Sequence, residues 1–165
     1  MQANIIDYGM NAEGVAKEND FIYFVPYLLV GEKVEIEIER LYKNYADAKL
    51  KSILSPSSKR RKPPCPYFYD CGGCSLQHAS YSEQLRYKSL LVKKTIKKIA
   101  ELDCDVSPTV PSDKIFHYRN KASFNFSVNS AGFFKQKSKE IVDISNCLIL
   151  NENINKVYSE RKLNN

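Results

Sequence analysis

Three of the five cysteines of this chain lie close together, at Cys65, Cys71 and Cys74 in the run CPYFYDCGGC. Two cysteines three positions apart can turn their sulfurs toward one point only where the backbone bends sharply, and the two glycines between them permit that bend. Glycines also leave backbone N–H groups free to point at thiolates. The spacing therefore predicts a metal-binding loop that lacks one ligand.

The fourth ligand has two candidates in the sequence, Cys104 and Cys147. Cys147 comes shortly after a β-rich run at residues 139–144, so a strand end would hold it in place. Cys104 stands between Asp103 and Asp105, where negative charge opposes thiolate formation. We therefore choose Cys147.

The spacing favours an iron–sulfur cluster over zinc. Structural zinc commonly takes two Cys-x-x-Cys knuckles or a mixture of Cys and His, whereas one cysteine-rich loop plus a distant cysteine is a common way to hold a cluster. His78, four positions past Cys74, keeps a zinc site open as an alternative. Disulfide pairing is disfavoured because the number of cysteines is odd and no signal peptide is visible.

Composition points to a folded protein with an affinity for nucleic acid. The 165 residues carry a net charge of +6 and include 11 Tyr and 8 Phe. Basic charge attracts phosphate and aromatic rings stack on unpaired bases, which favours single-stranded or looped RNA. No apolar run approaches the roughly 20 residues that cross a bilayer. We expect a cytoplasmic monomer with an RNA partner, no membrane association and no DNA partner.

Residues 1–55 read as a small β domain. Val34, Ile36 and Ile38 alternate with charged residues and so should face a core, and residues 46–51 alternate in the same sense after a natural turn at Lys43-Asn44. About five short strands in this length predict a small closed barrel of the oligonucleotide-binding type. A β-barrel without a ligand is the alternative.

Residues 56–64 form a linker by composition, followed by the cysteine loop at 65–79. The linker holds four consecutive basic residues, which are Lys59, Arg60, Arg61 and Lys62. They could grip phosphates, in which case RNA binding should weaken with salt, or they could be a solvated run of charge.

A helix is predicted for residues 80–101. Ser80 and Glu83 fit a capping box, and apolar residues recur at helical spacing. An amphipathic helix with a soluble back competes here with a helix that contacts RNA directly. The predicted apolar face consists of Tyr81, Leu85, Val92, Ile96 and Ile99.

Residues 108–150 return to a β pattern and should form a small antiparallel domain that carries Cys147. Phe124, Phe126 and Val128 would line one face of a strand, and residues 129–132 resemble a hairpin turn. Residues 151–165 read as the start of a truncated helix. The predicted fold is α+β, mainly β with one long helix.

Together these motifs resemble the iron–sulfur-containing ribosomal RNA (uracil-5-)-methyltransferases over nearly the whole chain. The Cys-x5-Cys-Gly-Gly-Cys motif is the most specific of them. The N-terminal part resembles the family's TRAM domain, an RNA-binding barrel. The segments that carry the resemblance are Gly14-Val15-Ala16, Phe24-Val25-Pro26, Gly31-Glu32, Pro63-Pro64, Gln77-His78, Gln84-Leu85, Tyr118-Arg119-Asn120-Lys121, Gly132-Phe133 and Val142-Asp143-Ile144.

The resemblance implies a [4Fe–4S] cluster on Cys65, Cys71, Cys74 and Cys147. It also implies a ribosomal RNA hairpin or loop as partner. The candidate RNA contacts are the basic residues 59–62 together with Arg119 and Lys121.

One part of the family pattern is not visible. Methyl transfer in the family needs a C-terminal domain with a glycine-rich loop for S-adenosylmethionine, a cysteine that attacks uracil and a base. None of the six glycines forms such a loop after a strand, and Cys104 matches no nucleophile motif. We expect an N-terminal part that binds RNA and a cluster but does not methylate alone. The alternative is a stand-alone RNA-binding module folded by zinc or a cluster.

Overall fold

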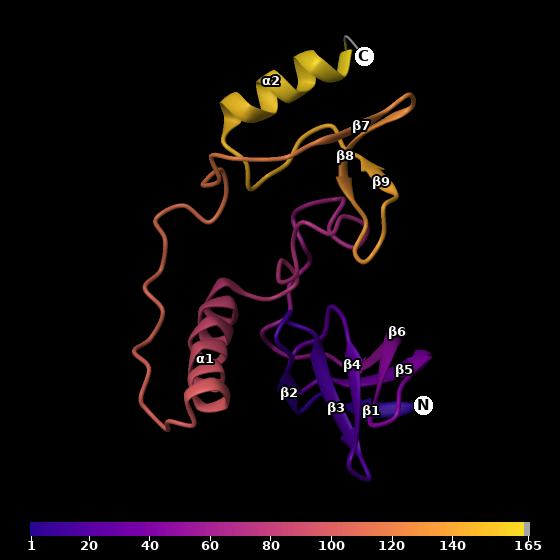
Figure 1. The fold of residues 1–165 in the computed structure, drawn as a ribbon, viewed down its shortest axis with the longest axis vertical. Helices are drawn as coiled ribbons and strands as arrows, with labels where there is room; N and C mark the ends of the chain where they lie inside the picture. The colour runs from indigo at the N-terminus through magenta and orange to yellow at the C-terminus, as the bar shows by residue number, and fades with distance from the viewer. Residues whose placement is uncertain (164–165) are drawn as a thin grey trace. The chain divides into compact units, whose positions relative to one another are not determined.

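The computed structural model describes residues 1–163 and divides the chain into two compact units (Figure 1). Unit 1 contains residues 1–62 and 78–110, and unit 2 contains residues 63–77 and the chain from residue 111 onward. Neither described helix is both long and apolar enough to span a bilayer. Each unit has its own sheet and its own core.

Unit 1 is built on a six-stranded mixed sheet in the order β1-β5-β6-β4-β3-β2. All neighbours are antiparallel except β4 and β6, which are parallel. The long β5–β6 hairpin turns at Lys43-Asn44, which confirms the predicted hairpin. The strands are β1 (Gln2–Asn4), β2 (Asp7–Tyr8), β3 (Gly14–Glu18), β4 (Phe21–Val25), β5 (Lys33–Leu41) and β6 (Tyr45–Ser55).

The sheet has six strands rather than the expected five because the first strand is interrupted. Residues 2–4 pair with β5, and residues 7–8 pair with β3 at the other end of the strand order. Ile5 and Ile6 bridge the two halves, since Gly31 N donates to Ile5 O at 2.8 Å and Ile6 N donates to Val15 O at 2.9 Å. One short segment thus supplies both edge strands of the sheet.

The core of unit 1 follows the alternation of the strands, with one exception. Val34 and Ile36 are fully buried, as predicted, but Ile38 is 45% exposed. Ile36 and Ile38 pair with Leu50 and Ala48 in one unbroken register, so the two side chains share a face. Every residue of β5 after Ile36 is exposed, so this end of the strand extends beyond the core, and alternation predicts the face but not where the core ends.

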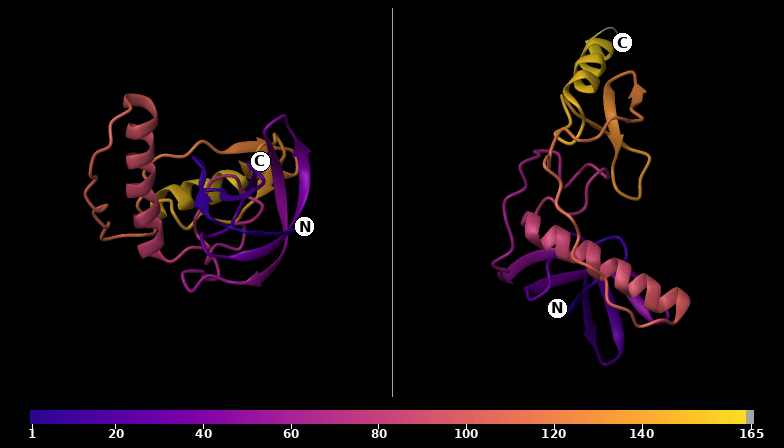
Figure 2. Two further views of the ribbon diagram at one scale, coloured as in Figure 1. Left: turned by 90° about the horizontal axis from the view of Figure 1, so that it is seen from below. Right: turned by 90° about the vertical axis from the view of Figure 1, so that its left-hand side faces the viewer.

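Helix α1 (Tyr81–Ala100) lies beside the strands of unit 1 (Figures 1 and 2). The Ser80 side chain accepts a hydrogen bond from Glu83 N at 3.3 Å, as a helix cap should. The capping box is only half formed, because Ser80 N donates to Lys59 O and the Glu83 carboxylate binds other groups.

The apolar face predicted for this helix is the wrong one. The helix residues buried against the strands are Glu83 and Tyr87, and the Tyr87 ring meets Tyr8 edge-on at 5.3 Å. Val92 and Ile99, on the opposite side, are 48% and 78% exposed. The helix therefore packs through Tyr87 and the ion-paired Glu83 and not through its aliphatic residues.

Unit 2 contains a three-stranded antiparallel sheet and helix α2 (Glu152–Leu163). Tyr158 of α2 is the centre of its core, with Phe124 stacked on its ring at 4.0 Å. The strand predicted from residue 118 forms only at residues 125–127, and Val128 is 94% exposed. The predicted fold class counted one long helix, and α2 lies in the segment 151–165 that was read as the start of a second one; residues 164–165 of that segment lie outside the described residues. The strands are β7 (Asn125–Ser127), β8 (Ser130–Phe134) and β9 (Ile141–Asp143).

Candidate functional site

The cysteine loop of unit 2 is folded by its own backbone and held against β8. Cys71 N donates to Tyr67 O at 2.8 Å, and Gly72 N donates to Phe134 O at 2.9 Å. A Cβ on Gly72 would lie only 3.0 Å from Phe134 O. A side chain at this position would force this close approach of loop and strand to open by a few tenths of an ångström, which favours glycine there.

The backbone N–H of the second glycine, Gly73, points at a cysteine sulfur. Gly73 N donates to Cys71 Sγ at 3.4 Å, and Cys65 N donates to the side-chain oxygen of the buried Gln77 at 3.3 Å. N–H groups aimed at sulfur stabilise thiolate character and tune metal–thiolate sites. One N–H of the Gly-Gly pair thus points at a cysteine sulfur, as expected, although neither glycine adopts a positive φ.

Cys147 follows β9 and is fixed by helix α2. Cys147 N donates to Asn155 Oδ1 at 2.9 Å, and Asn155 Nδ2 donates back to Cys147 O at 3.0 Å. Sequence analysis missed Asn155. A polar residue eight positions after a cysteine, one turn into a predicted helix, carries no distinctive signal by itself.

The four chosen cysteines line one cavity of about 220 Å³ within unit 2. Cys104 does not line it and is exposed in unit 1. Arg119 contributes the only charged side chain among the lining residues. The fold thus brings together the residues that were chosen from spacing.

The cavity raises the pKa of three of its thiols. Burial is the main cause for Cys65, Cys71 and Cys74, and an electrostatic interaction with Cys147 adds to it at each. These thiols are therefore protonated near neutral pH unless a cation stabilises their thiolates. The interactions also show that Cys147 is electrostatically close to all three.

The metal prediction is not confirmed by the geometry alone. Within residues 1–163, no group of three or more His, Cys, Asp or Glu side chains is arranged to hold a metal ion. Around a single zinc ion the sulfurs lie about 2.3 Å from the metal and so about 4 Å from one another. A four-iron cluster places its own atoms between the thiolates, and its ligands therefore surround a volume.

His78, the alternative zinc ligand, does not line the cavity. Its ring is fully buried within unit 1 and meets Tyr27 edge-on, with ring centroids 6.2 Å apart. Burial, reinforced by the positive charge of Arg60, lowers the pKa of His78 to about 4. The imidazole is a neutral core group, which accounts for it without a metal.

The basic segment proposed as an RNA contact is partly structural. Arg60 donates from Nε to Glu32 Oε1 at 2.5 Å and from Nη2 to Glu32 Oε2 at 2.7 Å, and Glu32 is fully buried. Burial alone would raise the pKa of Glu32. Hydrogen bonds from Arg60 and from the backbone of Leu29 and Ser57 outweigh burial and lower that pKa. The Arg60 side chain is only 15% exposed, so its charge is committed to Glu32.

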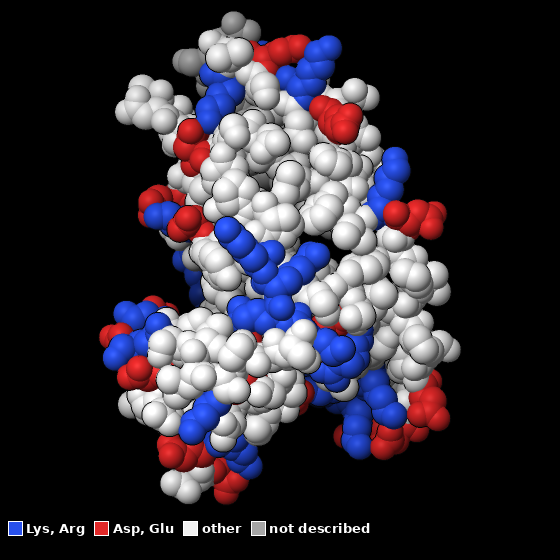
Figure 3. All heavy atoms as spheres, turned by 180° about the vertical axis from the view of Figure 1, so that it is seen from behind, with Lys and Arg blue, Asp and Glu red and all other residues white. Residues whose placement is uncertain are grey.

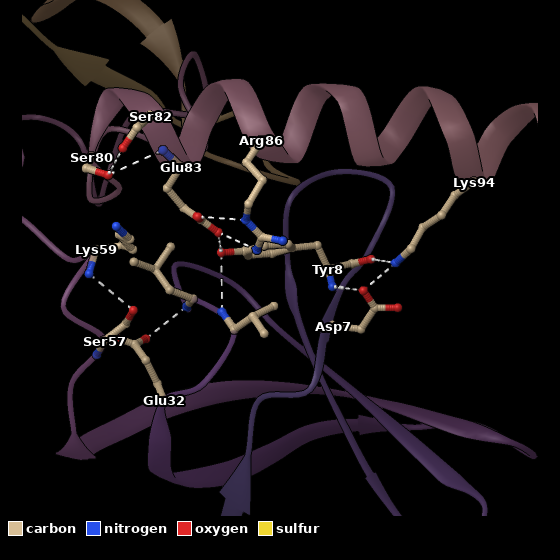
Figure 4. A network of polar contacts seen from close by, with 12 residues as sticks. Asp7, Tyr8, Glu32, Ser57, Lys59, Ser80, Ser82, Glu83, Arg86 and Lys94 are labelled. Carbon is tan, nitrogen blue, oxygen red and sulfur yellow. Dashed lines mark hydrogen bonds and ion pairs between the residues drawn. The ribbon is translucent and has the colours of Figure 1, made fainter. Parts of the chain in front are cut away.

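A second buried carboxylate ties α1 to the strands (Figure 4). Glu83 accepts a hydrogen bond from the Tyr8 hydroxyl at 2.7 Å and forms an ion pair with Arg86 at 2.6 Å. Hydrogen bonding from Arg86 keeps the pKa of Glu83 below its usual value. Nearby, Lys94 pairs with Asp7.

Most basic residues of α1 are neutralised. Besides Arg86 and Lys94, Lys93 pairs with Asp105 and Lys97 pairs with Asp103. The exposed Lys59 and Lys62 make no ion pair within the described chain. Figure 3 shows acidic side chains interleaved with basic ones over much of one face, with one group of Lys and Arg that has few acidic neighbours.

Comparison with known proteins adds an independent set of findings. Residues 3–51 match the TRAM domain family. An uncharacterized RNA methyltransferase of Clostridium tetani is 36% identical over 157 residues, which cover 93% of this chain and 34% of the relative. One of Listeria monocytogenes is 40% identical over 156 residues, with 92% and 34% covered.

The fold has a counterpart among solved structures. The crystal structure of Pyrococcus abyssi tRNA (uracil-54, C5)-methyltransferase in complex with S-adenosyl-L-homocysteine matches with a TM-score of 0.68 and 27% identity. The match covers 99% of this chain and 36% of that one. The chain contains a TRAM domain and has RNA methyltransferase homologues, and it spans about a third of their length.

Proposed function

We propose that this chain is the RNA-binding and [4Fe–4S]-bearing part of an S-adenosylmethionine-dependent RNA uracil-5-methyltransferase. The TRAM domain and the RNA methyltransferase homologues support its role in RNA binding. The observation that carries the cluster proposal is the cavity in which Cys65, Cys71, Cys74 and Cys147 meet. By itself the chain is expected neither to bind S-adenosylmethionine nor to transfer a methyl group.

The cluster would be held by these four cysteines and would act as a cross-link. When bound it supplies iron–thiolate bonds that join the loop at 65–74 to the segment after β9; methyl transfer moves no net electrons. The chain's own groups prepare the site, since Gly73 N–H already points at a sulfur and Asn155 fixes the backbone at Cys147. Both contacts are made by the protein's own atoms and do not need a bound metal.

The proposed partner is a structured RNA, bound by a cytoplasmic monomer. A ribosomal RNA hairpin or loop is the first candidate, and transfer RNA is the second because the matched Pyrococcus enzyme acts on tRNA. Uridine must leave its stack to be methylated, so this part would hold the flanking RNA for a catalytic domain. Lys59, Arg61 and Lys62 stay as proposed phosphate contacts, together with Lys121.

The cluster is tested by metal analysis of protein purified without oxygen. We expect about four irons and four sulfides per chain, and loss of both when Cys147 is replaced by serine. Cys104→Ser is the matched control because that thiol is exposed and does not line the cavity. One zinc per chain without sulfide would support the alternative of an RNA-binding module with a structural zinc and would refute the cluster.

RNA binding is tested by titrating a labelled ribosomal hairpin and a tRNA at several salt concentrations. Removing two phosphate contacts makes the negative slope of log affinity against log salt concentration shallower by about two. We therefore expect the double variant Lys59→Ala and Lys62→Ala to bind more weakly and with a shallower slope. An affinity equal to wild type would mean that the segment is only solvated charge.

A further inference from the structure

Aromatic side chains form a row on the outer face of the unit 1 sheet, away from its core. Phe24 lies between two buried residues of β4, and Tyr45 precedes the fully buried Ala46 of β6. Because successive side chains of a strand point to opposite faces, Phe24 and Tyr45 lie on the outer face. Their rings meet edge-on with centroids 5.7 Å apart, so the row joins two neighbouring strands.

The row continues onto β5 as a stack. The Tyr42 ring is nearly parallel to the Tyr45 ring, with centroids 4.4 Å apart and an interplanar angle of 16°. The guanidinium of Arg40 lies over the Tyr42 ring, 5.2 Å from its centroid. Tyr42 N donates to Tyr45 O at 2.9 Å across the turn, so a tight hairpin end fixes the two rings relative to each other. We call Phe24, Tyr45, Tyr42 and Arg40 the stacking row.

The hairpin end of the stacking row is open to solvent. Tyr45 is 37% exposed and Arg40 is exposed, whereas Tyr42 and Phe24 are half-buried. Phe24 also lines an apolar groove of about 240 Å³ beside α1. The row therefore runs from this groove to an exposed guanidinium.

We propose that the stacking row binds unpaired RNA bases, which extend the stack on Arg40 and Tyr45. The proposal rests on the RNA-binding function proposed above and adds the site and the mode of contact. Unpaired bases stack on aromatic rings and on arginine guanidinium planes, and such contacts tolerate any base. Because the turn already holds the rings in place, little side-chain freedom is lost on binding.

The charges on this face favour bases over phosphates as the bound groups. Asp47 pairs in register with Arg40 of β5 and with Phe24 of β4, and its carboxylate repels phosphate. A neutral base stacks on the row without bringing its own phosphate there. Lys43 is exposed in the turn, so the hairpin end carries two cations beside the rings, which favours a nucleic-acid strand over an apolar protein surface.

The test measures binding of the full chain to an unstructured oligouridine of about ten nucleotides that carries one 2-aminopurine. Affinity is read from the fluorescence anisotropy of an end label, and stacking is read from the loss of 2-aminopurine fluorescence. We expect Tyr45→Leu to weaken affinity about tenfold and to abolish most of the fluorescence loss. Tyr45→Phe keeps the ring and should bind like wild type.

Two further variants separate stacking from charge and from apolar area. Arg40→Lys keeps the charge but loses the planar guanidinium, so it should bind about fivefold more weakly with an unchanged salt dependence. Leu41→Ala is the matched control, because Leu41 lies at the same hairpin end, is 68% exposed and has no ring. Its affinity should equal that of wild type.

The outcomes distinguish this proposal from the function on which it rests. Wild-type affinity and fluorescence loss in both Tyr45→Leu and Arg40→Lys would overturn the proposal and leave the row as cross-strand pairs that stabilise the hairpin. Because Arg40 is exposed, Arg40→Lys keeps the test valid even if Tyr45→Leu weakens the hairpin. A wild-type chain that binds the ribosomal hairpin or tRNA but not the oligouridine also contradicts the proposal. A wild-type chain that binds none of the three RNAs would instead refute the proposed RNA-binding function.

Discussion

Replacing Arg60 by alanine is expected to destabilise unit 1 far more than replacing any neighbouring basic residue. Glu32 has no exposed surface, and Arg60 supplies two of its hydrogen bonds, at 2.5 and 2.7 Å. Without the guanidinium a buried carboxylate keeps only the N–H groups of Leu29 and Ser57. Removing one partner of a buried ion pair costs about 3–5 kcal/mol.

The assay is urea unfolding and thermal unfolding, each followed by circular dichroism. For a chain of this size a loss of about 3–5 kcal/mol lowers the melting temperature by roughly 10 °C. Lys62→Ala is the matched control, because Lys62 is exposed and belongs to the same basic run; we expect a change within about 0.5 kcal/mol.

A double variant separates pairing from packing. Glu32→Met with Arg60→Met removes both charges, and replacing a buried pair by apolar residues is often neutral or stabilising. We therefore expect it to recover most of the stability lost in Arg60→Ala. A loss below about 1 kcal/mol in Arg60→Ala would refute the structural role assigned to this pair. The residue would then return to the proposed RNA contacts.

Three further predictions follow from groups outside this pair. The pKa of His78 in the folded protein is about 4, below the usual value near 6.5. The stability that the neutral imidazole contributes is therefore complete above pH 6.5 and is lost as pH falls toward 4, up to about 3 kcal/mol. In His78→Gln the urea midpoint should vary less with pH over this range, and pH profiles parallel to wild type would contradict the argument. A Cβ on Gly132 would lie 2.1 Å from Val142 O, so Gly132→Ala should cost more than about 2 kcal/mol and separate β8 from β9, visible as faster amide exchange there. Tyr158→Phe leaves the carbonyls of two core residues without the hydroxyl that now bonds them at 2.5 and 2.9 Å, and should lower the unfolding free energy by about 1–3 kcal/mol, whereas a neutral result would show that water replaces the hydroxyl.

Local patterns in the sequence predicted those parts of the fold that depend on neighbouring residues. The β5–β6 hairpin, the N-terminal cap of α1 at Ser80 and the Gly-Gly bend of the cysteine loop all follow from residues within a few positions of one another. Period-two alternation also identified Val34 and Ile36 as core. It failed at Ile38, which lies on the same face but at the end of β5 that extends beyond the core.

The face of α1 that packs could not be read from its own sequence. Leu85, Val92 and Ile99 form a plausible aliphatic stripe, yet the strands contact Tyr87 and Glu83. A carboxylate can be buried only where other groups donate hydrogen bonds to it. Tyr8, which donates to Glu83, lies far earlier in the chain, so the sequence near the helix does not reveal it. The same reasoning applies to Arg60, which lies in a basic run typical of a surface but pairs with the buried Glu32.

By itself the sequence determined the chemistry available to this protein: three cysteines spaced for a bent loop, two candidates for a fourth, and strand and helix segments to carry them. Only the tertiary structure decided which of these groups meet. Cys147 reaches the loop's cavity because a strand and a helix hold it there, and Arg60 is withdrawn from solvent because a buried carboxylate requires it. Spacing acts over a few residues, whereas burial and charge pairing depend on segments that only folding brings together.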